Sequence, residues 1–395
     1  MRSQLKIICA VSSKTACCGC EACVQICPKH CIKMQCDSEG FQYPTIDKAN
    51  CIECHLCEQV CPINVQSKTI REPLQIHLVK NSDENIRAQS SSGGAFQIIA
   101  ERIIKENGVV FGAYFDKDWN VVHGYVEKIE ELKKLRGSKY VQSHIGNAYL
   151  DAKKFLIHGR KVLFSGTPCQ IAALNKFLNK DYDNLYTVDF ICHGVPSPQI
   201  WSTYLSSIVK HINQPIENIS FRNKIQGWKS YCFSVTFAKT DKSEEFIMYE
   251  PLDKNPYLKG FIADLFLRPS CHNCHFKSFA NKSDITLADA WGMWDFAPEQ
   301  YDDKGHSLLI THTQKGNKLI SSFLCQSTLC PLSIIEKYNP AAYTSPKATT
   351  RRSKFFRLIS KYDFDTTINK CLPPPRLIDK VLWSINKRLN KYVKK

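Results

Sequence analysis

The sequence has no long run of apolar residues. Across 395 residues, no stretch approaches the roughly 18 consecutive apolar side chains that a membrane-spanning helix requires. The apolar run near the N-terminus, Ile7 to Val11, is too short for the core of a signal peptide. We therefore expect a cytoplasmic protein. With 43% hydrophobic residues the chain can bury a core, which excludes a disordered protein, and its length indicates more than one domain.

Acidic residues are scarce at one end of the chain. The net charge is +16, and residues 347–395 alone carry 14 basic and 3 acidic side chains. Residues 1–70, in contrast, carry 7 basic and 6 acidic side chains. Basic charge confined to one terminal segment indicates a docking surface for an anionic partner, lipid or RNA, and does not explain the body of the protein.

Cysteine is abundant, with 20 in the chain. In a reducing compartment these thiols do not form a disulfide framework, so metal ligation is the first hypothesis to test. Two similar units, Cys17 to Pro28 and Cys51 to Pro62, form an internal repeat. Each has the spacing C-x2-C-x2-C-x3-C-P, which is typical of the 4Fe-4S sites of bacterial ferredoxins.

In such a run, three closely spaced thiolates bind one cluster and the fourth points toward the other cluster. We therefore expect the two units to exchange their fourth ligands. The first 4Fe-4S cluster is assigned to Cys17, Cys20, Cys23 and Cys61. The second is assigned to Cys51, Cys54, Cys57 and Cys27. A pair of four-cysteine zinc sites is the alternative, although zinc motifs usually separate two C-x2-C pairs by a longer loop.

From about residue 73 the chain alternates between strand-like and helix-like runs. Strands are predicted at Val109 to Phe115, Val121 to Val126, Val162 to Ser165, and Thr187 to Ile191. Gln170 to Leu178, between the last two strands, has the apolar spacing of a helix, so a parallel unit is predicted. The fold class is thus α/β and α+β multidomain. We expect a two-cluster ferredoxin-type domain over 1–72, a mixed α/β flavin and iron–sulfur domain over 73–345, and a basic tail with an amphipathic helix over 346–395.

Four further cysteines could form a third site. Cys169 and Cys192 lie just beyond the ends of consecutive predicted parallel strands, the edge at which open α/β sheets bind ligands. The C-x2-C pair Cys271 and Cys274 would complete a four-thiolate set, so a third 4Fe-4S cluster is predicted. The alternative is two ordinary buried cysteines with zinc or no metal at the pair. Cys18 is assigned no role, and packing roles are assigned to Cys9, Cys31, Cys36, Cys232, Cys325, Cys330 and Cys371.

The large second region indicates a further cofactor. Iron–sulfur clusters pass single electrons, and a flavin, here FAD, is the usual converter to two-electron chemistry. Ser91, Ser92, Gly93 and Gly94 precede the helix-like segment Ala95 to Ile104 and form a candidate phosphate cradle, because amide groups at a helix start can bind an anion. An ordinary helix N-cap is the alternative.

Several strings, in this order, resemble the coenzyme F420 hydrogenase/dehydrogenase beta-subunit family. They are Ser91-Ser92-Gly93-Gly94, Gly112-Ala113-Tyr114-Phe115-Asp116, Arg136-Gly137-Ser138-Lys139-Tyr140, Thr167-Pro168-Cys169-Gln170, Cys192-His193-Gly194, Phe221-Arg222-Asn223-Lys224, Cys271 with Cys274, and Ser283-Asp284-Ile285-Thr286 through Asp289 to Trp291-Gly292. The resemblance covers about residues 73–325. It implies an FAD-containing iron–sulfur oxidoreductase, and it favours both the third cluster and the Ser91 to Gly94 cradle. Relatives exchange hydride with the deazaflavin coenzyme F420, reduce a chlorophyll derivative, or accompany polysaccharide-synthesis genes.

Individual residues then receive expected roles. Arg136 and Lys139 could neutralise the reduced flavin or its pyrophosphate, and solvated surface cations are the alternative. His193 is a candidate proton donor, with a hydrogen bond to cluster sulfur as the other role. Asp289 would contact the flavin or cap the turn before Trp291.

The expected function is electron relay between 4Fe-4S clusters and FAD, with hydride exchange with a diffusible substrate, either F420-like or a polysaccharide-pathway metabolite. The expected partner is a redox protein or a small-molecule hydride carrier. Two alternatives are a non-catalytic electron-transfer subunit of a larger redox complex and a zinc protein that binds nucleic acid, the latter disfavoured. The basic C-terminal helix suggests contact with the inner membrane surface or a partner protein, or packing on the protein's own body.

Overall fold

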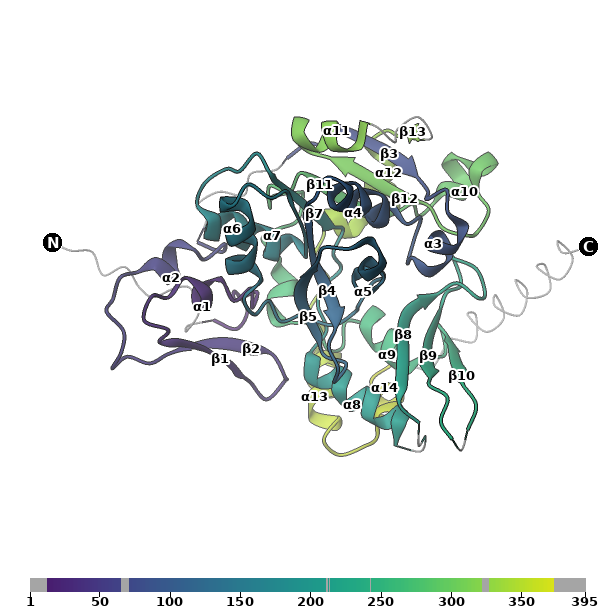
Figure 1. The fold of residues 1–395 in the computed structure, drawn as a ribbon. Coiled ribbons are helices and arrows are strands. Elements are labelled where there is room, and N and C mark those ends of the chain that lie inside the picture. Colours follow the sequence, from purple (N-terminus) through teal and green to yellow (C-terminus); the bar gives the residue numbers. More distant parts are fainter. Residues whose placement is uncertain are drawn as a thin grey trace, which may run out of the picture.

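The structure is a computed structural model that describes residues 13–372 apart from 65–70, 211, 213, 242 and 322–326. Figure 1 shows a small Cys-rich part with α1, α2, β1 and β2 at one end, beside α6 and α7 of a larger α/β part. The predicted C-terminal amphipathic helix lies outside the described residues. No helix within those residues has both the length and the apolar character needed to cross a bilayer.

The two cysteine units fold alike. Each contains one short helix, α1 (Ala22–Ile26) or α2 (Leu56–Gln59), and the antiparallel strands β1 (Ile32–Cys36) and β2 (Gln42–Ile46) lie between them. The residue before each helix, Glu21 or His55, has a positive φ, 61° and 59° respectively. The same tight turn therefore precedes the third cysteine of both units, as expected for a structural repeat.

The larger part is built on an eight-stranded mixed sheet with the order β13-β3-β12-β11-β7-β6-β4-β5. Its strands are β3 (Gln75–Val79), β4 (Val109–Phe115), β5 (Val121–Val126), β6 (Val162–Ser165), β7 (Leu185–Phe190), β11 (Ile285–Asp289), β12 (Ser307–Thr311) and β13 (Thr328–Leu329). The four central strands β4, β6, β7 and β11 are parallel, and antiparallel strands flank them. The predicted mixed α/β class and its parallel β6–α7–β7 unit are confirmed, with α7 at Pro168–Leu178.

Helices cover both faces of the sheet because neighbouring strand residues point to opposite sides. Val110 and Leu163 pack with α4 (Ala95–Lys105) on one face. Phe111 and Phe164 pack with α6 (Ala148–Ile157) and α7 on the other face. The remaining helices are α3 (Glu84–Gln89), α5 (Leu132–Leu135), α8 (Pro198–Val209), α9 (Pro256–Ile262), α10 (Met293–Phe296), α11 (Gln314–Ile320), α12 (Ser333–Tyr338), α13 (Thr350–Leu358) and α14 (Phe364–Cys371), with short 3-10 turns at Ile129–Glu131, Pro269–Asn273, Pro298–Gln300 and Pro340–Ala342.

A second, three-stranded sheet of β8 (Ile216–Asn223), β9 (Cys232–Phe237) and β10 (Phe246–Pro251) packs with α8 and α9. Helices α13 and α14 join the same aromatic cluster, in which Phe355, Phe364 and Ile368 are buried. The first part of the basic C-terminal region is therefore integral to the body of the protein.

The Cys-rich part is attached through α1. Its residues Cys20 and Ala22 share a core with α6 and α7. The Glu21 carboxylate accepts hydrogen bonds of 3.0 Å from the backbone N–H groups of Ile145 and Gly146, just before α6. Gln25 Oε1 accepts two more, each 3.1 Å, from the first turn of α6. The start of a helix has N–H groups without intrahelical acceptors, so these side chains serve as its cap.

Candidate functional site

The first cysteine set, Cys17, Cys20, Cys23 and Cys61, lines a single cavity. Three of these residues come from the first unit and one from the second, which is the exchange of ligands expected from the spacing. Burial raises the pKa of Cys23 to about 12, and the neighbouring thiols Cys17 and Cys57 add to the rise. Positive charge, such as iron supplies, would stabilise thiols held together in this way as thiolates. The cavity thus fits a 4Fe-4S cluster.

The second cysteine set, Cys27, Cys51, Cys54 and Cys57, lies farther from the α/β part. Cys27, Cys51 and Cys57 pack in one cluster, and Cys54 is exposed. In the described part of the chain, no three His, Cys, Asp or Glu side chains converge as closely as one metal ion requires. A cubane cluster differs from a single ion because its thiolates bind separate irons.

Cys31, to which the sequence assigned a packing role, adjoins the second set. Its buried thiol lies 3.4 Å from Cys27 Sγ. Burial by itself raises the pKa of Cys27, but hydrogen bonds from Cys31 and from the amides of Lys29 and His30 leave that pKa below its usual value. The bond to Cys27 raises the pKa of Cys31 to about 11. When Cys27 binds iron as a thiolate, Cys31 would be the donor of this contact.

We expect the Cys31→Ala variant to retain its iron. The reduction potential of the second cluster, which Cys27 would bind, should shift to more negative values. A hydrogen bond to a ligand sulfur withdraws charge from a cluster, so loss of that bond disfavours reduction. Redox titration monitored by EPR measures the shift. Cys36→Ala, which changes an exposed cysteine on β1, is the control, and an unchanged potential in Cys31→Ala would contradict the assignment.

The third cysteine set, Cys169, Cys192, Cys271 and Cys274, lines a second cavity. Cys169 lies in the first turn of α7 and Cys192 follows β7, so the parallel β6–β7 pairing brings both to one sheet edge. Burial raises the pKa of Cys192 well above its usual value, Lys277 opposes that rise, and the other three thiols of the set add to it. The four predicted thiols of the third set thus lie around one cavity.

Cys18 connects the first and third sets. It lines both cavities. Although the neighbouring Cys169 lowers the pKa of its thiol, the neighbouring Cys20 and burial raise that pKa well above its usual value. Cys18 lies outside the ligand spacing, so the sequence assigns it no role, yet it occupies the contact between the two cavities.

A buried carboxyl group, Asp189, also lines the third set's cavity. It accepts hydrogen bonds from Asn281 at 2.6 Å, Ser283 at 3.2 Å and Thr286 at 2.5 Å. Burial raises the pKa of Asp189 to about 7, although these bonds oppose the rise. The group can therefore hold or release a proton near neutral pH.

The candidate phosphate cradle meets the predicted basic loop. Ser91 Oγ accepts a hydrogen bond of 2.7 Å from the backbone N–H of Ser138. The Arg136 guanidinium donates to Gln97 on the first turn of α4 and to Gln89. Gly94, at φ 83°, precedes α4 and has no side chain with which to cap that helix. The start of α4 therefore has no side-chain cap from the residue that precedes it.

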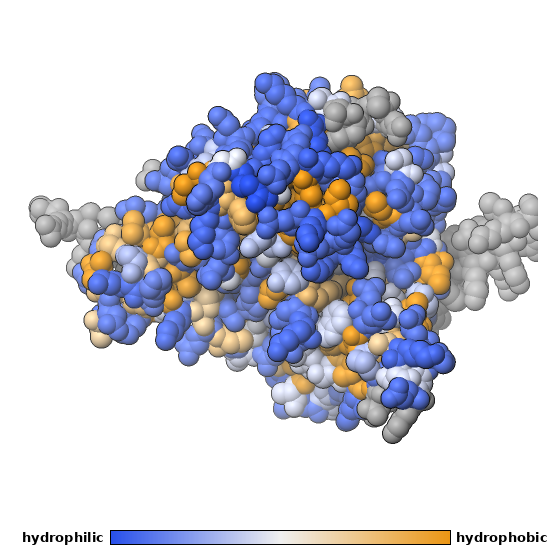
Figure 2. Space-filling model, viewed as in Figure 1, coloured by the Kyte–Doolittle hydropathy of each residue, from blue (hydrophilic) through white to orange (hydrophobic). Residues whose placement is uncertain are grey.

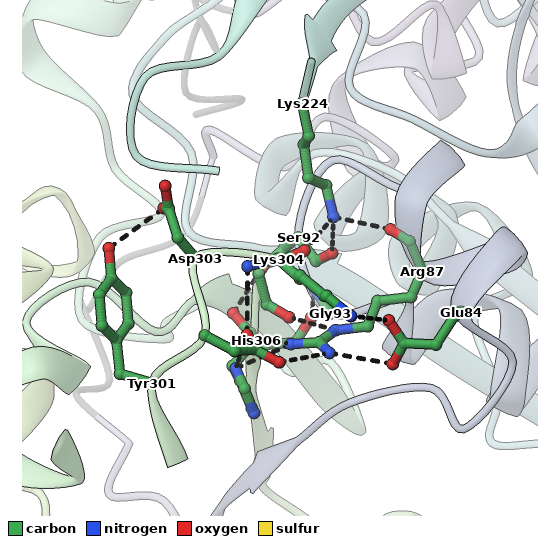
Figure 3. A network of polar contacts seen from close by, with 12 residues as sticks. Glu84, Arg87, Ser92, Gly93, Lys224, Tyr301, Asp303, Lys304 and His306 are labelled. Carbon is green, nitrogen blue, oxygen red and sulfur yellow. Dashed lines mark hydrogen bonds and ion pairs between the residues drawn. The ribbon is translucent and has the colours of Figure 1, made fainter. Parts of the chain in front are cut away.

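The loop from Ser90 to Gly94 is held by Lys224, which follows β8. Its ammonium donates to the carbonyl oxygens of Arg87, Ser92 and Lys304, at 2.6–2.7 Å (Figure 3). Burial lowers the pKa of Lys224 to about 7, and the charges of Arg222 and Arg87 act in the same direction. Ser92 and Gly93 also bond to the neighbouring segment, to His306 O and Ser307 Oγ. The cradle is therefore held by Lys224, which belongs to one of the strings that carry the family resemblance but has no role predicted from the sequence.

Lys139 and Asp289 lie in structural networks. The ammonium of Lys139 donates to the carbonyl oxygens of Leu135, Arg136 and Gly137, and burial lowers its pKa to about 7. The Asp289 carboxylate accepts from the Arg222 guanidinium at 2.5 Å and from the Trp228 indole at 3.2 Å. The charged groups of both residues therefore bond to other groups of the protein.

His193 lies between the third set's cavity and the basic loop. It lines that cavity, and its Nε2 is 2.6 Å from the Asp264 carboxylate. The edge of its ring faces Phe261 at 5.2 Å, and Phe261 stacks on Tyr140 at 4.6 Å. Tyr140 directly follows Lys139, so two aromatic contacts connect this cavity with the predicted flavin loop.

Comparison with known proteins identifies two regions. Residues 159–330 match the family model for the C terminus of the beta subunit of coenzyme F420 hydrogenase/dehydrogenase. Residues 16–65 match the 4Fe-4S dicluster domain. A chain of the F420-reducing [NiFe] hydrogenase complex from Methanosarcina barkeri is 18% identical, with 78% of this chain and 93% of that chain covered and a TM-score of 0.44. No curated protein matches the sequence. The family resemblance expected from the sequence is confirmed over residues 159–330.

Proposed function

From the premise that this chain is an iron–sulfur protein of the electron-transfer, oxidoreductase type, similar to F420 hydrogenase beta subunits, we propose that it relays electrons between three 4Fe-4S clusters and FAD. The first, second and third cysteine sets would hold the clusters. The cradle at Ser91 to Gly94 and the loop at Arg136 to Lys139 would hold FAD. When bound, FAD supplies the conversion between single electrons and a hydride.

The observation that supports this proposal is that the cavities lined by the first and third sets share two lining residues, Cys18 and Ile63. Two sites that can hold metal clusters therefore adjoin directly, one in each part of the protein. A fused ferredoxin-type domain with an internal role needs such a contact, whereas a separate electron carrier does not.

The flavin assignment is supported by the convergence of residues that are distant in sequence. Ser91 bonds to Ser138, Arg136 bonds to α4, and Lys224 bonds to Ser92. These contacts orient the cradle and place fixed positive charge beside it. Asp189 and His193 line the third set's cavity, beside the proposed third cluster.

The second cysteine set would receive electrons from the partner or deliver them to it. Cys54 is exposed, and Ile52 beside it is 56% exposed. Figure 2 shows that hydrophobic residues reach the surface over this Cys-rich part. A redox protein could dock there, while the substrate of the FAD site would be a small hydride carrier of the F420 type or a metabolite of polysaccharide synthesis.

Anaerobic purification of the full chain tests the proposal. We expect about twelve irons, an equal amount of labile sulfide and one FAD per chain, because each 4Fe-4S cluster contains four irons. About eight irons with bound FAD would remove the third cluster. Zinc in place of iron would contradict the proposal as a whole.

The second candidate is a non-catalytic electron-transfer subunit of a larger redox complex. It is favoured by the match to a beta-subunit family, since subunits function with partners. The flavin content of the purified chain separates the two, because this candidate predicts the clusters without any flavin.

A further inference from the structure

Arg268 lies at the junction of the two parts of the protein and is fully buried, with 0% of its surface exposed. Its Nε donates to Cys17 O at 2.8 Å, and one Nη donates to Gln142 Oε1 at 3.0 Å. The other Nη donates to Gln42 O at 2.9 Å and lies 3.7 Å from Cys17 Sγ. Every one of these acceptors is neutral except, when ligated, the thiolate of Cys17.

This arginine differs from three other arginines that are buried or half-buried. Arg87, Arg222 and Arg352 each pair with a carboxylate, from Asp302, Asp289 and Glu39 respectively. For Arg268, no such carboxylate lies within ion-pair distance in the described part of the chain. Hydrogen bonds to neutral groups satisfy its donors but leave its charge uncompensated. Burial of a charge is costly unless an opposite charge is near, so an anion is expected beside it.

The surroundings fix the guanidinium in one position. It lies over the ring of Tyr43 at 4.3 Å and near that of Phe41 at 5.4 Å. Gly19, at φ +68°, leaves room for it, since a Cβ there would lie 2.7 Å from Arg268 Nη1. The guanidinium is therefore held in one position beside the first cysteine set. Cys271 and Cys274 of the third set closely follow Arg268 in the sequence.

The charge acts on both sets. One Nη approaches Cys17 of the first set. In the third set, the backbone N–H of Cys271 donates to Arg268 O at 2.9 Å, so Arg268 and Cys271 lie in one turn of the chain. A buried positive charge beside ligands of two adjoining cavities favours added electrons in both.

We propose that Arg268 is the shared counter-cation of the first and third cysteine sets and raises the reduction potentials of the clusters they hold. Because one charge acts on both, its loss shifts the two potentials in the same direction. One electron then passes between them, oxidising one cluster and reducing the other, with the redox partner as the external source or acceptor. This inference rests on the proposed third cluster, and Arg268 acts as a positioning residue.

The test compares reduction potentials in the full chain, prepared without oxygen and titrated under EPR. In Arg268→Gln, we expect the potentials of the first and third clusters to shift to more negative values and that of the second cluster to stay unchanged. Arg268→Lys keeps the positive charge, so the potentials of the first and third clusters should lie closer to the wild-type values than in Arg268→Gln. Arg352→Gln removes an arginine at the same junction whose charge Glu39 compensates, and it should leave all three potentials unchanged.

A second variant covers the case in which Arg268→Gln does not fold. Gln142→Glu keeps the shape of the acceptor 3.0 Å from the guanidinium and supplies the missing carboxylate, so it neutralises Arg268 without removing it. We expect the same negative shift in both clusters. Wild-type potentials in Gln142→Glu overturn the proposal, and a shift in one cluster alone overturns the shared role.

The proposed function is judged separately, by the iron and flavin content of the wild-type protein. A wild type with about eight irons removes the third cluster whatever the variants show. A wild type with about twelve irons and unshifted variants removes only the role of Arg268.

Discussion

Cys169→Ser should lose about four of about twelve irons and keep both ferredoxin-type clusters. A serine hydroxyl is a poor ligand for iron, and Cys169 lies with the other three thiols of the third set around one cavity. The first set has four cysteines of its own, so its cluster remains. Electron delivery from a reduced external donor to FAD should then fall to the background rate. Iron and sulfide analysis with EPR measures the first effect, and stopped-flow reduction of the flavin measures the second.

Cys330→Ser is the matched control, because Cys330 is also half-buried but follows β13 at the edge of the large sheet, where its thiol bonds to the carbonyl oxygen of Thr328. It should retain all its iron. If Cys169→Ser keeps about twelve irons, the third site does not exist as proposed. If it loses every cluster, the substitution has disrupted the junction with α1, and Cys274→Ser, on a different segment of the chain, decides between the two explanations.

Lys224→Met should weaken FAD binding by roughly tenfold to hundredfold. The substitution removes three hydrogen bonds and leaves the carbonyl oxygens of Arg87, Ser92 and Lys304 without their donor. Each buried carbonyl group left unpaired costs about 1–3 kcal/mol, and about 1.4 kcal/mol corresponds to a tenfold change in affinity. The loop relaxes to pair these groups elsewhere, which misplaces the cradle. Quenching of flavin fluorescence on titration measures the dissociation constant.

The iron content of Lys224→Met should match that of the wild type, since the three acceptors of Lys224 belong to the cradle and its neighbours and not to a cysteine set. Lys239→Met is the control, because Lys239 is an exposed cation that pairs with Glu244. Unchanged flavin affinity in Lys224→Met would place the FAD site elsewhere. Concurrent loss of iron would show a general loss of structure.

The frame of the α/β part could be predicted well because its strands are short apolar runs with clear ends. Three strands, β4, β5 and β6, have the predicted limits. The fourth, β7, begins at Leu185, two residues before the prediction, because pairing with β6 extends to Leu185 and Tyr186. The pairing of a strand with its neighbour depends on the tertiary structure, so the apolar periodicity of one segment cannot predict where that pairing begins.

The thiols of the first two sets could be predicted because their spacing is local in sequence, and Cys169 and Cys192 because both follow strands of the predicted parallel unit. The residues that act on those thiols could not. Arg268 lies 251 positions from Cys17, and Lys224 lies 132 positions from Ser92. Only the folded chain brings them together, and neither has a local pattern beyond its place in or near the strings that carry the family resemblance. The roles of Cys18 and Cys31 were not predicted for the opposite reason: each is close to a ligand in the sequence but lies outside the expected ligand spacing.

The cap that Glu21 and Gln25 form on the start of α6 has a consequence for how electrons arrive. A diffusing ferredoxin must meet its acceptor by collision, so its delivery rate falls on dilution. Here the carrier is tethered and oriented, and its effective concentration at the acceptor does not depend on how much protein the cell contains. Turnover within each molecule should therefore be first order, and only the meeting with the outside partner should depend on abundance.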